Sequence, residues 1–578
     1  MKSNITIQRH QLKGDENAIE GVPPVIERLL QNRGINSADE IAFGLNHLLP
    51  PEGMLGIDSA VSIIYRALRE DLHILIIGDY DADGATSTAV AIRALKMMGC
   101  GRLSYLVPNR FEYGYGLTPE IVAVALNENP DLIITVDNGI ASVDGVAAAR
   151  AAGVQVIITD HHLAGRELPV ADAIINPNQP GDQFSSKHLA GVGVIFYLML
   201  ALRSYLRETG WFEEKRIDIP NLARLLDLVA LGTVADLVKL DHNNRILVQQ
   251  GLARVRAGEA CEGIKAVMQV AKRDESRLTS QDFGFALGPR LNAAGRMDDM
   301  TIGIETLLCD DTPRAMRLAT ELDELNQFRK ETESTMREEA MAILAKMDLA
   351  SKDLPVGLVL YDPEWHEGVI GIIASRVKEY CHRPVIVFTD SKDGEIKGSA
   401  RSIKGFHMRD ALDYVATENS GLLNKFGGHA MAAGLSLPRE NLEQFKTAFN
   451  QFAMEQLSDD QLQQKVWSDG ELSEQEMSLE LVEQINLSLP WGQGFEPPLF
   501  DGLFEVVQFK WLADKHLKMV LCRKESRQPI DAIYFFASSD EVQPVEGYAE
   551  IVYRPDINIW NGRQKMQLIV NQIRFKVQ

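Results

Sequence analysis

Three short apolar segments in the first third of the chain each end in acidic or histidine side chains. The segments are HILIIGDYDADG at 73–84, DLIITVDNG at 131–139 and VQVIITDHH at 154–162. Carboxylates that share a low-dielectric site repel one another unless divalent cations neutralise them. We therefore predict a metal centre for phosphoester chemistry, built from Asp79, Asp81, Asp83, Asp137, Asp160, His161 and His162.

Parallel β-strands are the elements that must position these groups. Residues 74–77, 132–136 and 154–159 are short and rich in branched aliphatic side chains, which is typical of strands buried on both faces. Parallel sheets present ligand sites at the carboxyl ends of their strands, so the acids should meet at one edge. Any one acid could instead be a helix cap or a turn residue, as Asp83 before Gly84 illustrates. The histidine pair could likewise be buried and simply hydrogen-bonded.

Length and cysteine content indicate a large protein of a reducing compartment. At 578 residues the chain should hold three or more domains. Its five cysteines lie far apart and form no CxxC pair, which argues against a zinc ribbon or a disulfide framework. No apolar stretch approaches the roughly 18 residues of a membrane span, and the first residues lack a signal-peptide core. We expect a cytoplasmic protein without a membrane partner.

Apolar patterning predicts an α/β fold class with several parts. Ala-rich helices alternate with the three strands, as in a doubly wound domain. The stretch between Pro313 and Pro355 lacks Gly and Pro, which predicts one long connecting helix. Short strands broken by turns near the C-terminus favour a small antiparallel barrel of the oligonucleotide-binding (OB) type. The expected domains are a helical accessory segment at 1–70, a catalytic domain at 71–240, a helical region with the connecting helix at 241–350, a smaller α/β domain at 351–455 and the barrel at 465–578.

Charge is informative only locally. The net charge of -22 counts against a nucleic-acid partner, because phosphate binding depends on clustered Lys and Arg. Residues 510–527, however, contain six basic residues and two acids, interleaved with aromatic side chains. A basic groove with stacking aromatics is typical of single-stranded nucleic-acid binding and would use Trp511 and Lys518. Small barrels also serve as protein docking modules, so that use remains open.

Two segments after the first α/β domain add charged side chains to this pattern. Asp236 follows an apolar helix at 221–232 and could fold back on the acidic cluster or act as a helix cap. In GPRLNAAGR at 288–296, Arg290, Asn292 and Arg296 suit a loop that brings guanidinium groups to a phosphate backbone. A structural arginine paired with helical acids is the alternative.

The second α/β domain contains two unusual segments. In KGSARS, Ser399 and Arg401 lie two apart in a strand-like stretch, so they should face the same side and could bind a terminal phosphate. In GGHAMAAGL, Gly427 and Gly428 allow close backbone approach beside His429. A tight helix start with a buried histidine is the alternative for this segment.

Taken in order, these motifs resemble those of the DHH phosphoesterase family. GDYDADG, VDNG, DHH and GTVADL are similar to its four motifs, and GGHAMAAG is similar to the signature of its associated C-terminal domain. The fuller set adds VPNRFEYGYGL, GPRLNAAGR, WHEGVIGI, GSARS and the terminal barrel. It resembles the family's bacterial single-strand-specific 5′–3′ DNA exonucleases from about residue 40 to the end.

The resemblance implies hydrolysis with two divalent cations, Mn²⁺ or Mg²⁺. Smaller family members carry a histidine where this chain has Ile77, and Asp79 is the implied replacement. His162 would contact the scissile phosphate, and Asp160 would orient the imidazoles from outside the ligand set. The other implied ligands are Asp81, Asp83, Asp137, His161 and Asp236, with Asp137 as the bridging carboxylate.

The resemblance also implies how single-stranded DNA is bound. Arg110, Ser399 and Arg401 correspond to a pocket for the 5′-terminal phosphate, and His429 corresponds to a contact with the substrate backbone. Implied roles are recombinational, mismatch and base-excision DNA repair at the nucleoid, beside a single-strand DNA-binding protein and a helicase. The implied substrate contacts are Arg110, Tyr115, Arg290, Asn292, Arg296, Ser399, Arg401, His429, Trp511 and Lys518.

Two other functions are compatible with the same motifs. One is a phosphodiesterase for short oligonucleotides or cyclic dinucleotides, or a pyrophosphatase; such relatives are shorter and need no terminal barrel. The other is a non-enzymatic replication scaffold, but scaffolds of this kind lose metal-binding acids that this chain retains. The sequence therefore favours the exonuclease.

Overall fold

The chain folds into two compact units. The computed structural model describes residues 6–10, 19, 21–108, 116–165, 167–346, 354–391, 394–419, 421–428, 430–513, 515–523, 528–537, 542–560 and 562–576. The N-terminal unit comprises Glu16–Asn326 and Glu483–Pro497, and the C-terminal unit comprises Met1–Asp15, Gln327–Val482 and Pro498–Gln578. The five domain limits expected from the sequence stay predictions. Within the described residues, no helix combines the length and the apolar character needed to span a membrane.

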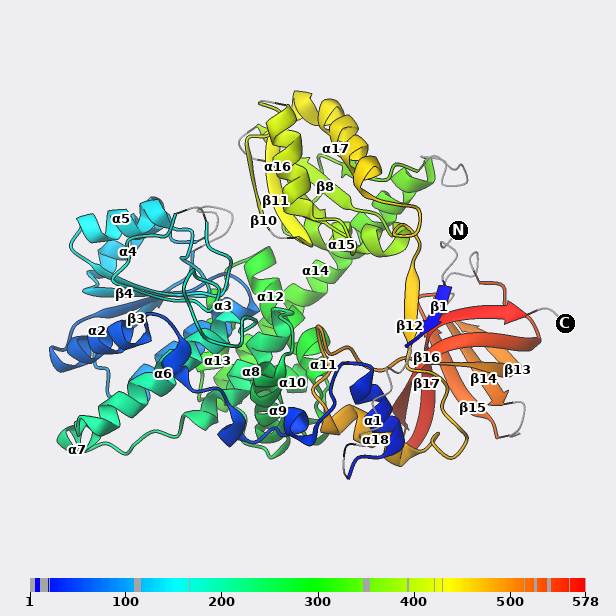
Figure 1. The fold of residues 1–578 in the computed structure, drawn as a ribbon, viewed down its shortest axis with the longest axis horizontal. Helices are drawn as coiled ribbons and strands as arrows, with labels where there is room; N and C mark the ends of the chain where they lie inside the picture. The colour runs from blue at the N-terminus through cyan, green and yellow to red at the C-terminus, as the bar shows by residue number, and fades with distance from the viewer. Residues whose placement is uncertain are drawn as a thin grey trace. The chain divides into compact units, whose positions relative to one another are not determined.

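The N-terminal unit contains a five-stranded parallel sheet (Figure 1). Its strands are β2 (Ile74–Ile77), β3 (Leu103–Leu106), β4 (Leu132–Val136), β5 (Gln155–Thr159) and β6 (Ala173–Ile175). They lie in the order β3-β2-β4-β5-β6, and all neighbouring pairs are parallel. β2 and β4 are buried along their whole length, as their branched aliphatic residues predict. The α/β class and the three expected strands are confirmed.

Helices cover both faces of this sheet. They are α2 (Ile57–Arg69), α3 (Ala82–Met97), α4 (Pro119–Ala125), α5 (Val143–Ala151) and α6 (Gly191–Glu208); the short α7 (Trp211–Lys215) packs against α6. On one face, Leu75, Ile133 and Val156 of the strands form a single core with apolar residues of α4 and α5. α3 and α6 pack against each other on the opposite face. The loops that carry the acidic residues therefore follow β2, β4 and β5, whose residues are buried except for Gln155 at the start of β5.

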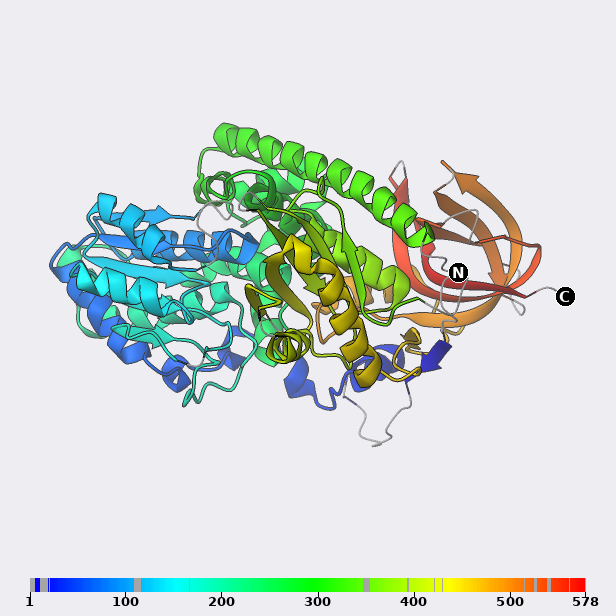
Figure 2. The same ribbon diagram turned by 90° about the horizontal axis from the view of Figure 1, so that it is seen from above.

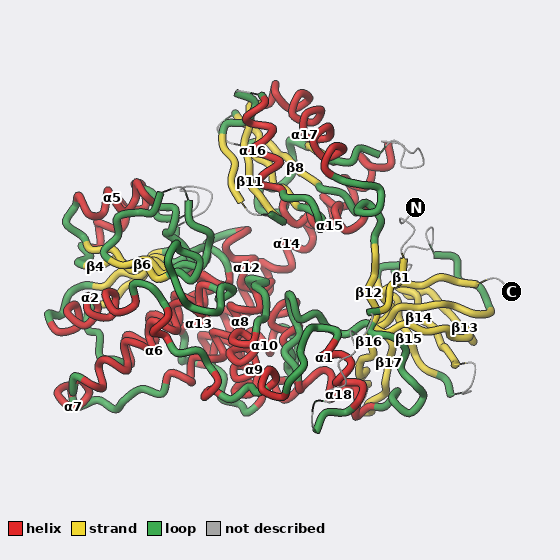
Figure 3. Tube along the Cα trace, in the orientation of Figure 1, coloured by secondary structure: helices red, strands yellow, loops and turns green. Residues whose placement is uncertain are grey.

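A helical region completes the N-terminal unit (Figure 3). Its elements are α1 (Pro24–Gln31), α8 (Leu226–Ala235), α9 (His242–Arg256), α10 (Glu262–Val270), α11 (Ser280–Asp282), a π-helix (Phe283–Leu287), α12 (Gly288–Met297) and α13 (Thr301–Leu308). Short 3₁₀ helices lie at Ala38–Ile41, Leu45–His47, Pro51–Gly53, Leu222–Leu225 and Glu275–Arg277. The predicted loop at 288–296 is wrong, because these residues form α12. Pro289 lies in the first turn, where a helix tolerates proline, and the small residues allow close packing instead of a turn.

A long helix and a mixed sheet follow. α14 (Thr312–Lys346) runs for 35 residues without interruption, which confirms the predicted connecting helix (Figure 2). The sheet has the order β10-β11-β9-β8-β7. Its elements are β7 (Leu358–Tyr361), α15 (Ile370–Cys381), β8 (Val385–Asp390), β9 (Glu395–Arg401), α16 (Met408–Glu418), β10 (Lys425–Gly428), β11 (Ala432–Pro438), a 3₁₀ turn (Arg439–Asn441) and α17 (Leu442–Gln456).

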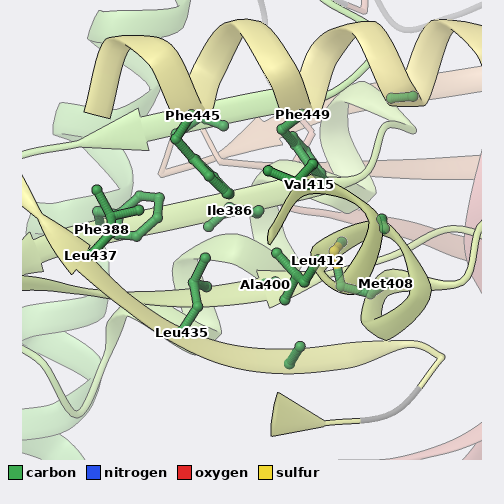
Figure 4. Close-up of a cluster of buried hydrophobic side chains, with 14 of the residues drawn as sticks. Ile386, Phe388, Ala400, Met408, Leu412, Val415, Leu435, Leu437, Phe445 and Phe449 are labelled. Carbon is green, nitrogen blue, oxygen red and sulfur yellow. The ribbon is translucent and has the colours of Figure 1, made fainter. Parts of the chain in front are cut away.

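The core of this sheet lies under α16 and α17. Phe445 and Phe449 of α17 pack over Ile386 and Phe388 of β8 (Figure 4). The alternative of a helix start at 427–435 is wrong, because β10 and β11 pair as antiparallel strands. Gly428 has φ 140°, and a Cβ there would lie 2.5 Å from the carbonyl oxygen of Ala432, so only glycine fits this end of β10.

The last part of the chain is a closed five-stranded barrel, as predicted, but it is not antiparallel throughout, because β15 and β17 pair as parallel strands. Its strands follow the order β13-β14-β15-β17-β16 around the barrel. The bounds are β13 (Phe500–Leu512), β14 (His516–Arg523), β15 (Ile530–Phe535), β16 (Gly547–Trp560) and β17 (Arg563–Lys576), preceded by α18 (Leu479–Ser488). One pairing was not expected from the sequence: β1 (Thr6–Arg9) adds a parallel strand to β12 (Lys465–Ser468). Arg9 then bonds to the buried Asp501, which ties this pair to the start of β13.

Candidate metal centre

Seven acidic and histidine side chains gather at the carboxyl ends of β2, β4 and β5. β2 and β5 lie on either side of β4, so the residues that follow the three strands meet at one edge of the sheet. Asp236 joins them from the end of α8. Within each of three groups, one ligand atom per residue lies within 4.8 Å of the others. The groups are Asp79, Asp81 and Asp137; Asp83, His161 and Asp236; and Asp137, His161 and His162.

Backbone N–H groups at the start of α3 hold the carboxylate of Asp81, and those at the start of α6 hold the carboxylate of Asp83. Asp81 is the N-cap residue, and its Oδ1 accepts from the N–H groups of Asp83 and Gly84 at 2.9 and 3.0 Å. The capping role considered for Asp83 therefore belongs to Asp81. The Asp83 carboxylate instead accepts from the N–H groups of Gly191 and Val192, at 2.6 and 2.9 Å, where α6 begins.

Three residues that support the centre were not predicted from the sequence. A Cβ at Gly191 would lie 2.5 Å from Oδ1 of Asp137, so α6 can approach the centre only with glycine at this position. Asn176 and Asn178 donate to the carbonyl oxygens of His162 and His161, at 2.9 and 2.6 Å. The two asparagines in NPNQP, shortly after the DHH segment, were the sequence signal from which Asn176 and Asn178 could have been predicted.

The imidazole of His161 lies among carboxylates. Its Nε2 is 3.1 Å from Oδ1 of Asp137, 3.4 Å from Oδ2 of Asp236 and 4.0 Å from Oδ2 of Asp83. Burial lowers the pKa of His161, which favours the neutral ring. This buried Nε2 has no hydrogen-bond partner among the described residues. A neutral ring nitrogen that faces three carboxylate oxygens fits a metal ligand.

Burial and mutual repulsion raise the pKa values of the clustered acids. Burial is the largest cause in each case. It raises the pKa of Asp83 to about 7, with a further contribution from Asp236, and that of Asp236 to about 8, with a further contribution from Asp81. The pKa of Asp137 also lies well above its usual value, through burial and the neighbouring Asp83. Divalent cations would remove this repulsion, so the donor set of carboxylates and imidazole fits Mn²⁺ or Mg²⁺.

Asp160 belongs to none of the three groups, but its carboxylate holds the backbone of Ile140 and His161 and the ring of His162. One of its oxygens accepts from the N–H of Ile140 at 2.9 Å, and the other accepts from the N–H of His161 at 2.7 Å. Nδ1 of His162 is 2.8 Å from Oδ1 of Asp160. Although burial opposes the charged ring, this bond and the charge of Asp160 raise the pKa of His162 to about 9. The arrangement suits the orienting role expected for Asp160.

Comparisons with known proteins agree with this geometry. Three family models match the chain: the DHH family N-terminal domain at 73–233, the DHHA1 domain at 355–455 and the RecJ OB domain at 468–572. Over 575 residues the chain is 50% identical to the single-stranded-DNA-specific exonuclease RecJ of Escherichia coli (strain K12), covering 99% of this chain and 100% of that protein. The chain belongs to the RecJ family.

Other members support the assignment. The RecJ of Salmonella typhimurium (strain LT2) is also 50% identical, with the same coverage of both chains. The solved structure of RecJ in complex with Mn²⁺ from Thermus thermophilus matches with a TM-score of 0.80 at 27% identity, over 99% of this chain and 80% of that one. The resemblance to DHH phosphoesterases is confirmed, and with it the combination of a DHH domain, its associated domain and an OB barrel.

The segment GPRLNAAGR lies close to the acidic cluster, and Arg290 and Asn292 make contacts within the protein. The guanidinium of Arg290 bonds to Asp323 at 2.8 Å and to the carbonyl of Ala286 at 2.7 Å, which is the structural alternative for this arginine. Oδ1 of Asn292 accepts from the N–H of Ala82 at 2.8 Å, directly after Asp81. Arg296 is half-buried on the same helix. Their roles as DNA contacts stay predictions.

The predicted phosphate-binding pair of the RecJ-family DHHA1 domain lies together on β9. Nη1 of Arg401 donates to Oγ of Ser399 at 3.1 Å and to the carbonyl of Ala400 at 2.8 Å. Burial lowers the pKa of Arg401, and no carboxylate of the described residues forms an ion pair with it. A Cβ at Gly371, in the first turn of α15, would lie 2.9 Å from Ser399 Oγ and 3.0 Å from Arg401 Nη2. Arg110, Tyr115 and His429 lie outside the described residues.

The two predicted contacts in the barrel face different ways. Trp511 pairs with Leu517, whereas Lys510 pairs with Lys518. Directly opposed residues share a face of the sheet, and successive residues alternate between faces. Leu517 is fully buried, so Trp511 shares the inner face and Lys518 the outer one. A groove that uses both side chains at once is therefore not formed by this hairpin alone.

The raised pKa values predict how metal-free protein responds to pH. Because the folded state keeps protons on Asp83 and Asp236 that the unfolded chain releases near pH 4, stability is lost as the pH rises towards 8. Each such proton corresponds to a slope of about 1.4 kcal/mol per pH unit. We expect the Tm in EDTA to fall between pH 6 and pH 8.5, and Mn²⁺ to raise it more at pH 8.5. Differential scanning fluorimetry measures both; an equal or smaller Mn²⁺ effect at pH 8.5 would contradict the expectation.

Proposed function

We propose that this protein is a single-stranded-DNA-specific exonuclease that releases mononucleotides from 5′ ends by metal-dependent hydrolysis. The observation that carries the proposal is the group of carboxylates and His161 at the end of a parallel sheet, in a member of the RecJ family. Homologous RecJ structures from Thermus thermophilus contain Mn²⁺ and Mg²⁺. The residues that would hold two such cations are Asp79, Asp81, Asp83, Asp137, His161 and Asp236.

The chain's own residues then prepare the site for a negatively charged substrate. When bound, the divalent cations supply a hydroxide nucleophile at neutral pH and offset charge on the phosphoryl group. The protonated imidazole of His162, held by Asp160, is a second positive group that can contact a phosphate oxygen. Asp137, with φ 63°, has a backbone conformation that is uncommon for a non-glycine residue, as is often found at functional sites.

Arg401 and Ser399 are the proposed contacts for a 5′-terminal phosphate. Arg401 lacks a carboxylate partner among the described residues, although its guanidinium is mostly buried. Its Nη2 and the Ser399 hydroxyl lie beside the first turn of α15, where backbone N–H groups favour anions. Such a site selects substrates by their 5′ end, and Arg110 would complete it.

The cellular role is part of the same proposal. A 5′–3′ exonuclease for single strands suits recombinational, mismatch and base-excision repair, where strands must be resected after unwinding. We propose that the protein acts in the cytoplasm at the nucleoid, with a helicase that provides single strands and a single-strand DNA-binding protein that covers them. The OB barrel supports binding of single-stranded DNA.

Product analysis tests the proposed reaction. With Mn²⁺, a single strand that carries a radioactive 5′-phosphate should release its label as a mononucleotide from the first turnover. A blunt duplex of the same sequence should release almost none, and a dinucleotide should be a poorer substrate than the long strand. Label released as an oligonucleotide, or equal cleavage of duplex and single strand, would overturn the proposal.

A further inference from the structure

We propose that helix α12 positions two ligand-bearing segments of the metal centre, and that Asn292 is the residue through which it acts on Asp81. The inference rests on the proposed function, because it concerns the cations of that same site. It assigns the GPRLNAAGR segment a task that differs from the phosphate contact expected from its arginines. The supporting contacts all lie within the N-terminal unit.

One face of α12 contacts both segments. Gly288, Asn292 and Gly295 are spaced by four and three residues, so they lie on the same side of the helix. Asn292 and Gly295 contact Ala82 and Tyr80, which flank Asp81. A Cβ at Gly288 would lie 3.1 Å from Cβ of Ala235, the residue before Asp236. The helix therefore spans the loop of Asp81 and the end of α8.

Asn292 accepts a hydrogen bond from a backbone N–H group of α3 that the N-cap residue Asp81 does not bind. The N–H groups in the first turn of a helix have no partner within the helix. Oδ1 of Asp81 serves those of Asp83 and Gly84, and Oδ1 of Asn292 accepts from the remaining N–H of Ala82, which is only 1% exposed. Without Asn292, this buried donor would compete for the carboxylate of Asp81 and draw it from the ligand position.

Gly295 brings the helix against the backbone of the same loop. A Cβ at this position would lie 1.8 Å from the carbonyl oxygen of Tyr80 and 2.9 Å from its carbonyl carbon. No side chain can enter that space, so the peptide between Tyr80 and Asp81 lies directly on α12. On another side of the helix, Arg290 bonds to Asp323 of α14, which fixes α12 in turn.

The π-helix before α12 determines which face of α12 points towards the loop of Asp81. It holds Phe283–Leu287 and leads directly into α12. One residue more or less rotates the following helix by about 100°. The wider turn therefore determines that Asn292 and Gly295, and not their neighbours, face the loop. π-turns of this kind are frequent beside functional sites.

Mn²⁺ binding by calorimetry, without DNA and on the full chain, tests the inference. Asn292→Ala removes the acceptor, and we expect it to weaken Mn²⁺ binding by about 10- to 100-fold, as loss of groups that orient metal ligands commonly does. Asn292→Asp keeps an acceptor oxygen and adds a negative charge near the cations, so it should bind Mn²⁺ at least as tightly as the wild type. The matched control is Asn243→Ala, since Oδ1 of Asn243 accepts from the N–H of Leu49 at 3.1 Å, and it should leave Mn²⁺ affinity unchanged.

The outcomes separate this inference from the proposed function. Unchanged Mn²⁺ affinity in Asn292→Ala, an equal loss in Asn292→Asp, or an equal loss in the control would overturn it. If the alanine variant does not fold, Asn292→Gln, which displaces the acceptor by one methylene, gives the same comparison with Asn292→Asp. If Asn292→Ala bound single-stranded DNA more weakly in EDTA but kept normal Mn²⁺ affinity, Asn292 would be a contact of the DNA phosphates instead. A wild-type chain that binds no Mn²⁺ would refute the proposed function itself.

Discussion

Asp137→Asn should lose more than about 1,000-fold of the nuclease activity, which corresponds to at least about 4 kcal/mol of transition-state stabilisation. Asp137 belongs to two of the three ligand groups and lies 3.1 Å from Nε2 of His161. It is also almost fully buried, so solvent water has little access to the position of its carboxylate. Release of mononucleotides from a single strand with Mn²⁺, measured at saturating DNA, gives the loss in turnover.

The control for this prediction is a carboxylate of the same unit that makes only a structural bond. Asp172 accepts from the N–H of Val156 near the start of β5, away from the carboxyl ends of the strands. Asp172→Asn should keep nearly full activity. Single-stranded DNA binding of Asp137→Asn in EDTA should equal that of the wild type. Activity within about tenfold of the wild type would contradict the assignment of Asp137 to the reaction centre.

Arg401→Ala should abolish the preference for 5′-phosphorylated ends. Charge-assisted hydrogen bonds contribute about 1.5–3 kcal/mol each, so cleavage of phosphorylated strands at low DNA concentration should fall by about 100-fold. Strands with a 5′-hydroxyl, which make no such bond, should be cut at nearly the wild-type rate. The ratio of kcat/KM for the two kinds of end measures the effect.

Arg383→Ala is the matched control for Arg401. Its guanidinium lies in the same unit and donates to the carbonyls of His382 and Leu462, without a carboxylate partner among the described residues. We expect this variant to retain the 5′-phosphate preference. A parallel fall for both kinds of end in Arg401→Ala would show that Arg401 supports the fold of β9 and does not bind the terminal phosphate.

The metal centre was predictable because its signals are local. Each of β2, β4 and β5 is a short buried run, and the rule for parallel sheets brings the residues after these runs together. The prediction of Asp236 required one further assumption, that the end of α8 returns to the acidic cluster. In the structure, Oδ2 of Asp236 lies 3.4 Å from Nε2 of His161, which confirms that the end of α8 returns to the cluster.

The supporting residues were not predictable in the same way, because their roles depend on tertiary contacts. The small residues around Asn292 suggested a loop, but in the structure the small Gly295 lets α12 lie against the backbone of Tyr80. Gly191 is one glycine among many in the sequence, and only the proximity of Asp137 reveals why it is needed. The β1–β12 pair joins residues far apart in the chain, and each strand has only four residues.

Crystals grown with Mn²⁺ test the central claim most directly, through the anomalous scattering of the metal. We predict two peaks at the carboxyl ends of β2, β4 and β5, with Asp137 in contact with both and His161 in contact with one. Full occupancy of this site would agree with the burial of Asp83 and Asp137 and with the raised pKa values in the cluster. Mn²⁺-saturated crystals without a peak at these carboxylates would contradict the account.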